Sequence, residues 1–174
     1  MDLPLLKIQS IMKMLSMKLF LAVCVVTWLG LTGARAQDKS ACLAVIVNKS
    51  SSLSDVSSAD LQKYFKAEKT KSPSGVKLVI VMADVGRPER TAALKAIYTM
   101  SEAEYNDYFV GQTFTGAVAA APKALPTPAE IKLYVSQTPG AIAYIRASDA
   151  DDSVTVLKIG GKLPGDADYG LKMQ

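Results

Sequence analysis

The segment Ala83–Thr91 carries the residues best suited to bind a small anion. Gly86, Arg87, Arg90 and Thr91 lie where an apolar run gives way to a helix pattern. The first N–H groups of a helix have no internal partner and attract oxyanions. A glycine lets a ligand approach the backbone, and an arginine offers a planar pair of donors. We therefore expect Gly86, Arg87, Arg90 and Thr91 to be ligand-binding residues.

The same segment also permits a simpler interpretation. Any strand-to-helix connection offers free N–H groups, and Pro88 removes one of them here. In this alternative Arg87 and Arg90 face solvent or pair with Asp84 or Glu89, and no ligand is bound.

The composition argues against most kinds of catalysis. The chain contains no histidine, which removes the commonest general base and the commonest zinc ligand. It also lacks a Cys-x-x-Cys pair, a P-loop and a glycine-rich dinucleotide turn. Two-carboxylate hydrolysis is compatible with the composition, but the acidic residues fall mostly in helix caps and polar loops. We expect a protein that is not an enzyme and that has no metal and no cofactor.

The first 36 residues have the features of an export signal. Three lysines precede the apolar run Leu19–Leu31, and Ala34-Arg35-Ala36 offers small residues at a cleavage position. The run of 13 residues is short of the roughly 20 needed to cross a bilayer, although a permanent membrane helix is the alternative. We expect a periplasmic mature chain, 37–174, that is not an integral membrane protein.

The charge of the mature chain gives little support to nucleic-acid binding. The formal charge of the whole chain is +4, and a net +3 of this lies in the first 36 residues. Nucleic-acid binding requires a basic face on the folded domain, so we expect no nucleic-acid partner. The lysines between Lys63 and Lys77 are interpreted as a solvated helix end and loop. Cys42 is the one cysteine left after cleavage, and it is expected to be buried, the alternative being a disulfide with another chain.

Four apolar runs predict the strands that position the Ala83–Thr91 segment. Short continuous runs rich in β-branched residues are typical of strands buried on both faces. The runs are Leu43–Val47, Lys77–Met82, Ala141–Ile145 and Val154–Ile159. The serine-rich Lys49–Ser58 and the proline-containing Gly116–Pro128 are predicted loops.

Four helices are predicted between and after the first strands. Their expected first residues are cap-forming or proline residues: Ser57 or Ser58, Pro88, Ser101 and Thr127. Residues at helical spacing should face the core. These are Leu61, Tyr64 and Phe65; Leu94, Ile97 and Tyr98; Tyr105, Tyr108 and Phe109; and Ile131, Tyr134 and Val135.

Strands that alternate with helices predict one α/β domain, a three-layer sandwich with a mainly parallel sheet flanked by helices. Ligands of such sheets bind beyond the carboxyl ends of the strands. The loops Asn48–Ser58 and Ala83–Arg90 are therefore the functional candidates. The tail after about residue 160 is rich in glycine and polar residues and is expected to be loose.

Several segments, in this order, resemble the substrate-binding proteins of phosphate transporters. The segments are Leu43–Asn48, Leu53–Phe65, Lys77–Met82, Phe114-Thr115-Gly116, and Val135 with Thr138-Pro139-Gly140-Ala141-Ile142-Ala143-Tyr144-Ile145. The last of these is similar to the "V..TPGAIGYV" passage of that superfamily. The resemblance implies one lobe of a type 2 periplasmic binding protein. It also implies binding of phosphate or another oxyanion in transport or sensing, with a membrane transporter or sensor component as partner.

The chain also departs from that family. Full-length phosphate binders open the helix after the second of these strands with a Ser-Gly-Thr triplet, whereas Gly86–Thr91 offers a hydroxyl only at Thr91. Classical members close two lobes around the solute, and this chain has room for one. The alternative function is therefore a domain that keeps the fold without a solute and acts as a periplasmic protein-interaction domain.

Overall fold

The computed structural model describes residues 41–173 of the 174-residue chain. These residues belong to one compact unit, Ala36–Gln174. The proposed export signal, 1–36, lies outside the described residues, so the cleavage site and export stay predictions.

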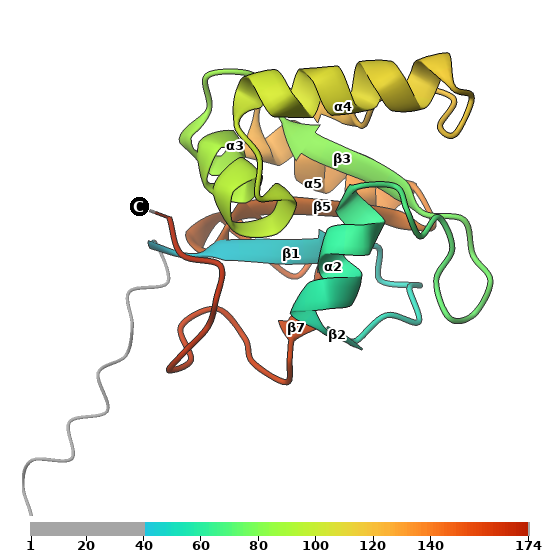
Figure 1. Ribbon diagram of the computed structural model, residues 1–174. Coiled ribbons are helices and arrows are strands. Elements are labelled where there is room, and N and C mark those ends of the chain that lie inside the picture. The colour runs from blue at the N-terminus through green and yellow to red at the C-terminus, as the bar shows by residue number, and fades with distance from the viewer. Residues whose placement is uncertain (1–40, 174) are drawn as a thin grey trace, which may run out of the picture. The chain divides into compact units, whose positions relative to one another are not determined.

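A five-stranded sheet with the order β4-β3-β5-β1-β6 forms the centre of the fold (Figure 1). The strands are β1 (Leu43–Val47), β3 (Val79–Ala83), β4 (Lys123–Leu125), β5 (Ala141–Arg146) and β6 (Thr155–Val156). β3 pairs in parallel with both β4 and β5, whereas β1 is antiparallel to its neighbours β5 and β6. Every strand except β1 therefore runs in the same direction.

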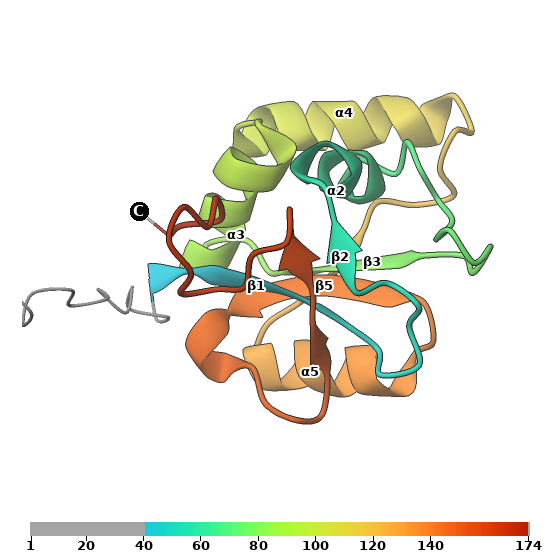
Figure 2. The same ribbon diagram turned by 90° about the horizontal axis from the view of Figure 1, so that it is seen from below.

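Helices cover both faces of this sheet. They are α2 (Ser58–Phe65), α3 (Pro88–Ala93), α4 (Glu102–Phe114) and α5 (Pro128–Gln137). Figure 2 shows α5 on one face and α2 with α4 on the other. The predicted three-layer sandwich with a mainly parallel sheet is confirmed. None of the helices within residues 41–173 combines the length and the apolarity that a bilayer crossing requires.

The helices begin where the sequence predicts them. Ser57, Ser101 and Thr127 each accept a hydrogen bond from a backbone N–H of the first turn, and Ser101 forms a full capping box with Glu104. The helix α3 opens at Pro88 and continues directly into a π-helical turn, Leu94–Tyr98. The predicted inward stripes are buried, apart from Tyr108 and Tyr134, which are half-buried.

An aromatic cluster fills the space between the sheet and the helices α2 and α4. Phe65 and Tyr105 each meet Tyr98 edge to face, with ring centroids 5.8 and 5.2 Å apart. Phe65 also packs on Tyr144 of β5. Burial raises the pKa of Tyr105 to about 12. It also raises the pKa of Tyr98 and Tyr144 above the ordinary tyrosine value, so these hydroxyls stay neutral over the physiological range.

Two short strands, β2 and β4, were not predicted, and one predicted strand is divided into two. β4 lies in the predicted loop Gly116–Pro128. β2 (Asp55–Val56) lies in the predicted loop Lys49–Ser58 and pairs in parallel with β7 (Lys158–Ile159). The predicted strand Val154–Ile159 is split at the buried Leu157, so that β6 and β7 belong to different sheets. Strands of two or three residues are too short to show a period of alternation.

The tail beyond residue 160 is packed against β1, and the prediction of a loose tail is wrong. Tyr169 is 1% exposed, and its hydroxyl donates to the carbonyl of Leu43 at 2.9 Å. The Leu43 N–H donates to the carbonyl of Leu171, and the Met173 N–H donates to the carbonyl of Ala41, both at 2.8 Å. Two apolar anchors, Tyr169 and Leu171, therefore hold a segment that is otherwise polar. Cys42 is buried, as predicted.

Candidate functional site

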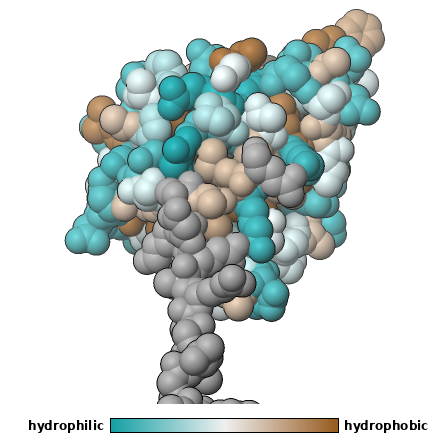
Figure 3. Space-filling view, turned by 90° about the vertical axis from the view of Figure 1, so that its left-hand side faces the viewer, coloured by the Kyte–Doolittle hydropathy of each residue, from teal (hydrophilic) through white to brown (hydrophobic). Residues whose placement is uncertain are grey.

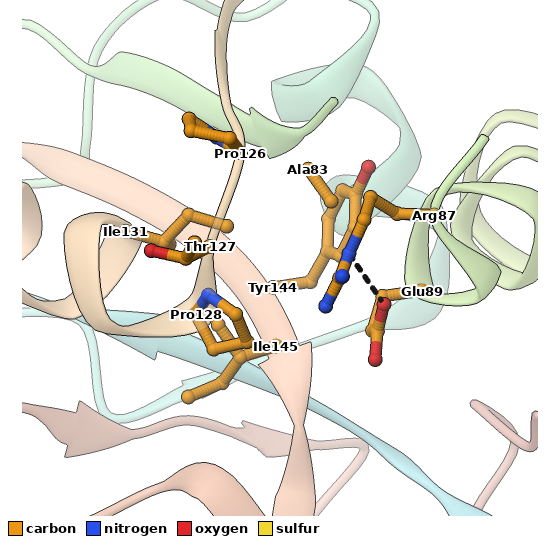
Figure 4. A pocket seen from close by; sticks show the side chains of 9 residues that line it. All are labelled: Ala83, Arg87, Glu89, Pro126, Thr127, Pro128, Ile131, Tyr144 and Ile145. Carbon is orange, nitrogen blue, oxygen red and sulfur yellow. Dashed lines mark ion pairs between the residues drawn. The ribbon is translucent and has the colours of Figure 1, made fainter. Parts of the chain in front are cut away.

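The carboxyl ends of the parallel strands β3, β4 and β5 meet at one edge of the sheet around a small cavity, here called the strand-end cavity (Figure 4). It is lined by Ala83, Arg87, Glu89, Pro126, Thr127, Pro128, Ile131, Tyr144 and Ile145. Its volume of about 10 Å³ is close to the minimum that admits one water molecule. A phosphate ion, with five heavy atoms, does not fit inside it.

A buried carboxylate between two arginines forms the polar part of this region, here called the Glu89 cluster. The side chain of Glu89 is 4% exposed, whereas those of Arg87 and Arg146 are 41% and 36% exposed. Glu89 Oε1 accepts a hydrogen bond from Arg146 Nη2 at 2.9 Å. Glu89 Oε2 lies 3.6 Å from Arg87 Nε, the pair marked in Figure 4. The two guanidiniums balance a charge that would otherwise be costly to bury.

The Glu89 cluster is not fully satisfied by hydrogen bonds. Among the residues that the structure describes, neither Glu89 Oε2 nor Arg146 Nε has a hydrogen-bond partner, and both atoms are buried. The ion pair with Arg87 is therefore electrostatic and lacks a good hydrogen bond. Buried polar atoms without partners are rare, and a bound water or ion is one of the explanations for them.

Arg90, one of the predicted ligand residues, is engaged elsewhere. Its Nε donates to both carboxylate oxygens of Glu102 at 3.1 and 2.8 Å, and its Nη2 donates to Glu102 Oε1 at 2.6 Å. Its Nη1 donates to the Ala83 carbonyl at 3.2 Å, and the guanidinium lies 4.9 Å from the ring centre of Tyr105. Burial acts to lower the pKa of Arg90, but the Glu102 contacts outweigh it and hold that pKa above its ordinary value. Arg90 links α3, α4 and the end of β3, and it does not line the strand-end cavity.

Gly86 and Thr91 also lie away from the cavity. Gly86 has φ +82°, and a Cβ there would meet no atom within 4 Å, so the glycine serves the turn rather than a close approach. Thr91 is exposed, and its hydroxyl faces the Arg87 carbonyl at 3.5 Å. Of the four predicted site residues, the structure places only Arg87 at the cavity.

Sequence reasoning missed the other charged members of the Glu89 cluster. Arg146 directly follows the predicted strand Ala141–Ile145, so the rule that ligands bind at the carboxyl ends of strands could have identified it. Glu89 was considered only as a possible partner of a surface arginine. Its burial follows from its position in the first turn of α3, which packs against β1, β3 and β5.

The loop Asn48–Ser58 is not at this edge of the sheet, so the strand-end rule that made it a functional candidate does not apply to it. Because β1 runs opposite to β3 and β5, its carboxyl end lies at the other edge. Asn48 is buried there, and its Nδ2 donates to the carbonyls of Val135 and Ser136, each at 2.8 Å. Its Oδ1 accepts from the Ser50 N–H at 2.9 Å. Asn48 thus satisfies the last turn of α5, a structural role.

The side of the molecule that carries α3 and the end of the tail is mainly hydrophilic (Figure 3). The most hydrophobic residues in view on this side lie apart from one another. Within residues 41–173 no group of three or more acidic, cysteine or histidine side chains has the arrangement to hold a metal ion.

No protein-family model matches the sequence, and no curated protein matches it significantly. Solved structures do match the fold. A protein assigned as a phosphate ABC transporter substrate-binding protein from Clostridium perfringens, solved with bound phosphate, matches with a TM-score of 0.58 and 20% identity over 71% of this chain and 46% of its own. An ABC-type phosphate transport receptor from Vibrio cholerae matches with a TM-score of 0.57 and 15% identity over 77% of this chain and 55% of its own. PstS from Borrelia burgdorferi matches with a TM-score of 0.58 and 15% identity over 76% of this chain and 55% of its own.

The chain spans about half the length of each of these structures. That share agrees with the prediction of a single lobe, and the predicted likeness in fold to these proteins is confirmed. At 15–20% identity the match establishes the fold alone.

Proposed function

We propose that this chain is an exported domain of the solute-binding type that recognises phosphate or a related small oxyanion, in a transport or sensing system. One observation carries the proposal. Arg87 and Arg146, from two different elements, converge on a single buried oxyanion, the carboxylate of Glu89. A carboxylate and a phosphate present the same kind of negatively charged oxygen to a guanidinium.

The position of this cluster supports the proposal. It lies at the carboxyl ends of parallel strands, where α/β sheets bind their ligands. Both arginines are more than one-third exposed, so their outer N–H groups are accessible to an anion from solvent. The start of the ten-residue helix α5 lines the same cavity with Thr127 and Pro128, and its partial positive charge favours an anion.

The comparisons support the same kind of ligand. The Clostridium perfringens protein of similar fold was solved with bound phosphate. The features of residues 1–36 favour export. The residues that the structure describes form one lobe, and the two arginines of the cluster reach solvent. A transporter or sensor component would then supply the second surface that encloses the anion.

Thermal unfolding and calorimetry of the purified protein test the proposal, with phosphate, sulfate and, as the ionic-strength control, chloride. A ligand at one hundred times its dissociation constant stabilises a protein by about 2.7 kcal/mol. We expect phosphate or sulfate to stabilise the wild type, and Arg87→Ala and Arg146→Ala to remove that effect. Lys158→Ala, an exposed lysine on β7, is the matched control and should keep it. No stabilisation at millimolar anion would exclude this function for the anions tested.

A second candidate is a domain of the same fold that binds a protein partner and no solute. The occupation of the arginines by Glu89, together with a cavity of about 10 Å³, favours it. The exposed Phe114 and Val110 of α4, 91% and 69% exposed, add apolar surface. The same titration separates the two candidates, because this second function predicts a wild type that does not respond to any of the anions.

A further inference from the structure

We propose that Glu89 is a resident anion that occupies the oxyanion position of the cluster and competes with external anions for Arg87 and Arg146. The inference rests on the proposed function, since it concerns the same two arginines. In this inference the carboxylate of Glu89 sets the affinity of the two arginines for external anions. The anions whose binding it weakens are phosphate and sulfate.

The geometry of the carboxylate favours a role beyond scaffold. A buried charged side chain in a structural ion pair normally has its polar atoms engaged in hydrogen bonds, and each of the three guanidinium nitrogens of Arg90 donates to Glu102 or to the Ala83 carbonyl. Glu89 differs, because its Oε2 has no hydrogen bond among the described residues and lies 3.6 Å from Arg87 Nε. The buried Arg146 Nε is also unused. The cluster therefore holds an acceptor and a donor that its own members do not satisfy.

The burial of the three side chains shows how the competition works. Glu89 is 4% exposed and the arginines are 41% and 36% exposed, so the carboxylate lies beneath two guanidiniums that reach solvent. An external oxyanion must bind those guanidiniums a few ångströms from the Glu89 charge. Two negative charges that lie a few ångströms apart near a protein surface repel each other strongly. In addition, each arginine already shares its positive charge with Glu89.

Two substitutions separate the charge of Glu89 from its shape. Glu89→Gln keeps the volume and removes the negative charge, so an anion at the mouth of the cavity meets two unshared guanidiniums. Glu89→Ala also removes the carboxylate group itself and enlarges the cavity beside Arg146. A small carboxylate such as formate can then take the place of the missing group.

The experiment measures phosphate and sulfate binding by calorimetry, and thermal midpoints with and without formate, for the wild type and both variants. Glu68→Gln is the matched control, because it removes one exposed glutamate charge away from the cluster. We expect Glu89→Gln to bind phosphate at least about tenfold more tightly than the wild type, with Glu68→Gln unchanged. We expect formate to stabilise Glu89→Ala saturably and to leave the wild type unaffected.

The outcomes distinguish this inference from the proposed function. If the wild type binds phosphate and Glu89→Gln binds no more tightly, the function stands and the inference is overturned. If the wild type does not respond and Glu89→Gln binds, the inference stands and the function fails for the wild type. If neither binds, both are overturned. Should Glu89→Ala fail to fold, Glu89→Gln still decides the matter.

Discussion

Replacing Glu102 with alanine should destabilise the fold more than replacing its partner Arg90 with methionine. The side chain of Arg90 is 5% exposed and that of Glu102 is 38% exposed. In Glu102→Ala the buried guanidinium keeps the Ala83 carbonyl as its one hydrogen-bond acceptor among the described residues, together with its contact on the Tyr105 ring. In Arg90→Met the charge that remains belongs to Glu102, which can reach water.

The burial of the two partners sets the size of these effects. Removing one partner of a fully buried ion pair costs about 3–5 kcal/mol. Because Glu102 is partly solvated, we expect about 2–3 kcal/mol for Glu102→Ala. Arg90→Met removes the buried charge together with its desolvation cost and keeps an apolar stem on Tyr105, so we expect about 1 kcal/mol. For a domain of this size the larger loss lowers the Tm by about 10 °C.

Denaturant unfolding followed by circular dichroism measures both variants and the double variant. Glu68→Ala, an exposed glutamate, is the control and should change stability by less than about 0.5 kcal/mol. If Arg90→Met is as destabilising as Glu102→Ala, the charge of Arg90 is needed for more than this pair. If both are neutral, Arg90 is solvent-exposed in solution and is again available to a ligand.

Three further predictions concern other parts of the fold. Asn48→Ala removes two hydrogen bonds to the end of α5 and should cost about 2 kcal/mol in urea unfolding; an unchanged midpoint would contradict the capping role. Gly140→Ala should cost at least about 3 kcal/mol or prevent folding, because φ is +81° and a Cβ would lie 2.3 Å from the Lys77 carbonyl oxygen; normal yield and Tm would refute the close approach. Burial raises the pKa of Tyr105 from 10.0 to about 12, so its neutral form stabilises the fold fully below pH 10. This contribution is lost as pH rises through about 12, so the absorbance of the Tyr105 tyrosinate and the unfolded fraction should rise together. If the Tyr105 hydroxyl titrates fully near pH 10 in the folded protein, its ring is exposed and the prediction is wrong.

The sequence predicts the sandwich well because its signals are local. Caps at Ser57, Ser101 and Thr127 and apolar stripes at helical spacing depend on neighbours within a few residues. The direction of a strand is different. A run such as Leu43–Val47, buried on both faces, has the same pattern whichever way the strand points. The antiparallel direction of β1 was therefore not predicted. As a result, the prediction placed the Asn48–Ser58 loop at the same edge of the sheet as Ala83–Arg90, whereas it lies at the opposite edge.

The candidate site was less predictable than the fold because the partners of its charges are set by tertiary packing. Arg90 reaches Glu102, 12 residues on, and Arg146 reaches Glu89 across 57 residues. An arginine in a loop has the same sequence context whether it is paired and buried or free in solvent. Only the strand-end rule offered a signal for Arg146, and nothing local marked Glu89 as buried.

The pairing of the tail with the first strand has a consequence for attachment. Ala41 and Met173 are joined by a backbone hydrogen bond of 2.8 Å, so the described chain enters and leaves the domain at one point. Leu43 pairs with Arg146, which places that point at the same sheet edge as the Glu89 cluster. A tether or a fused domain joined at either end would begin beside the candidate site. Such an attachment would set which surfaces can approach the two arginines.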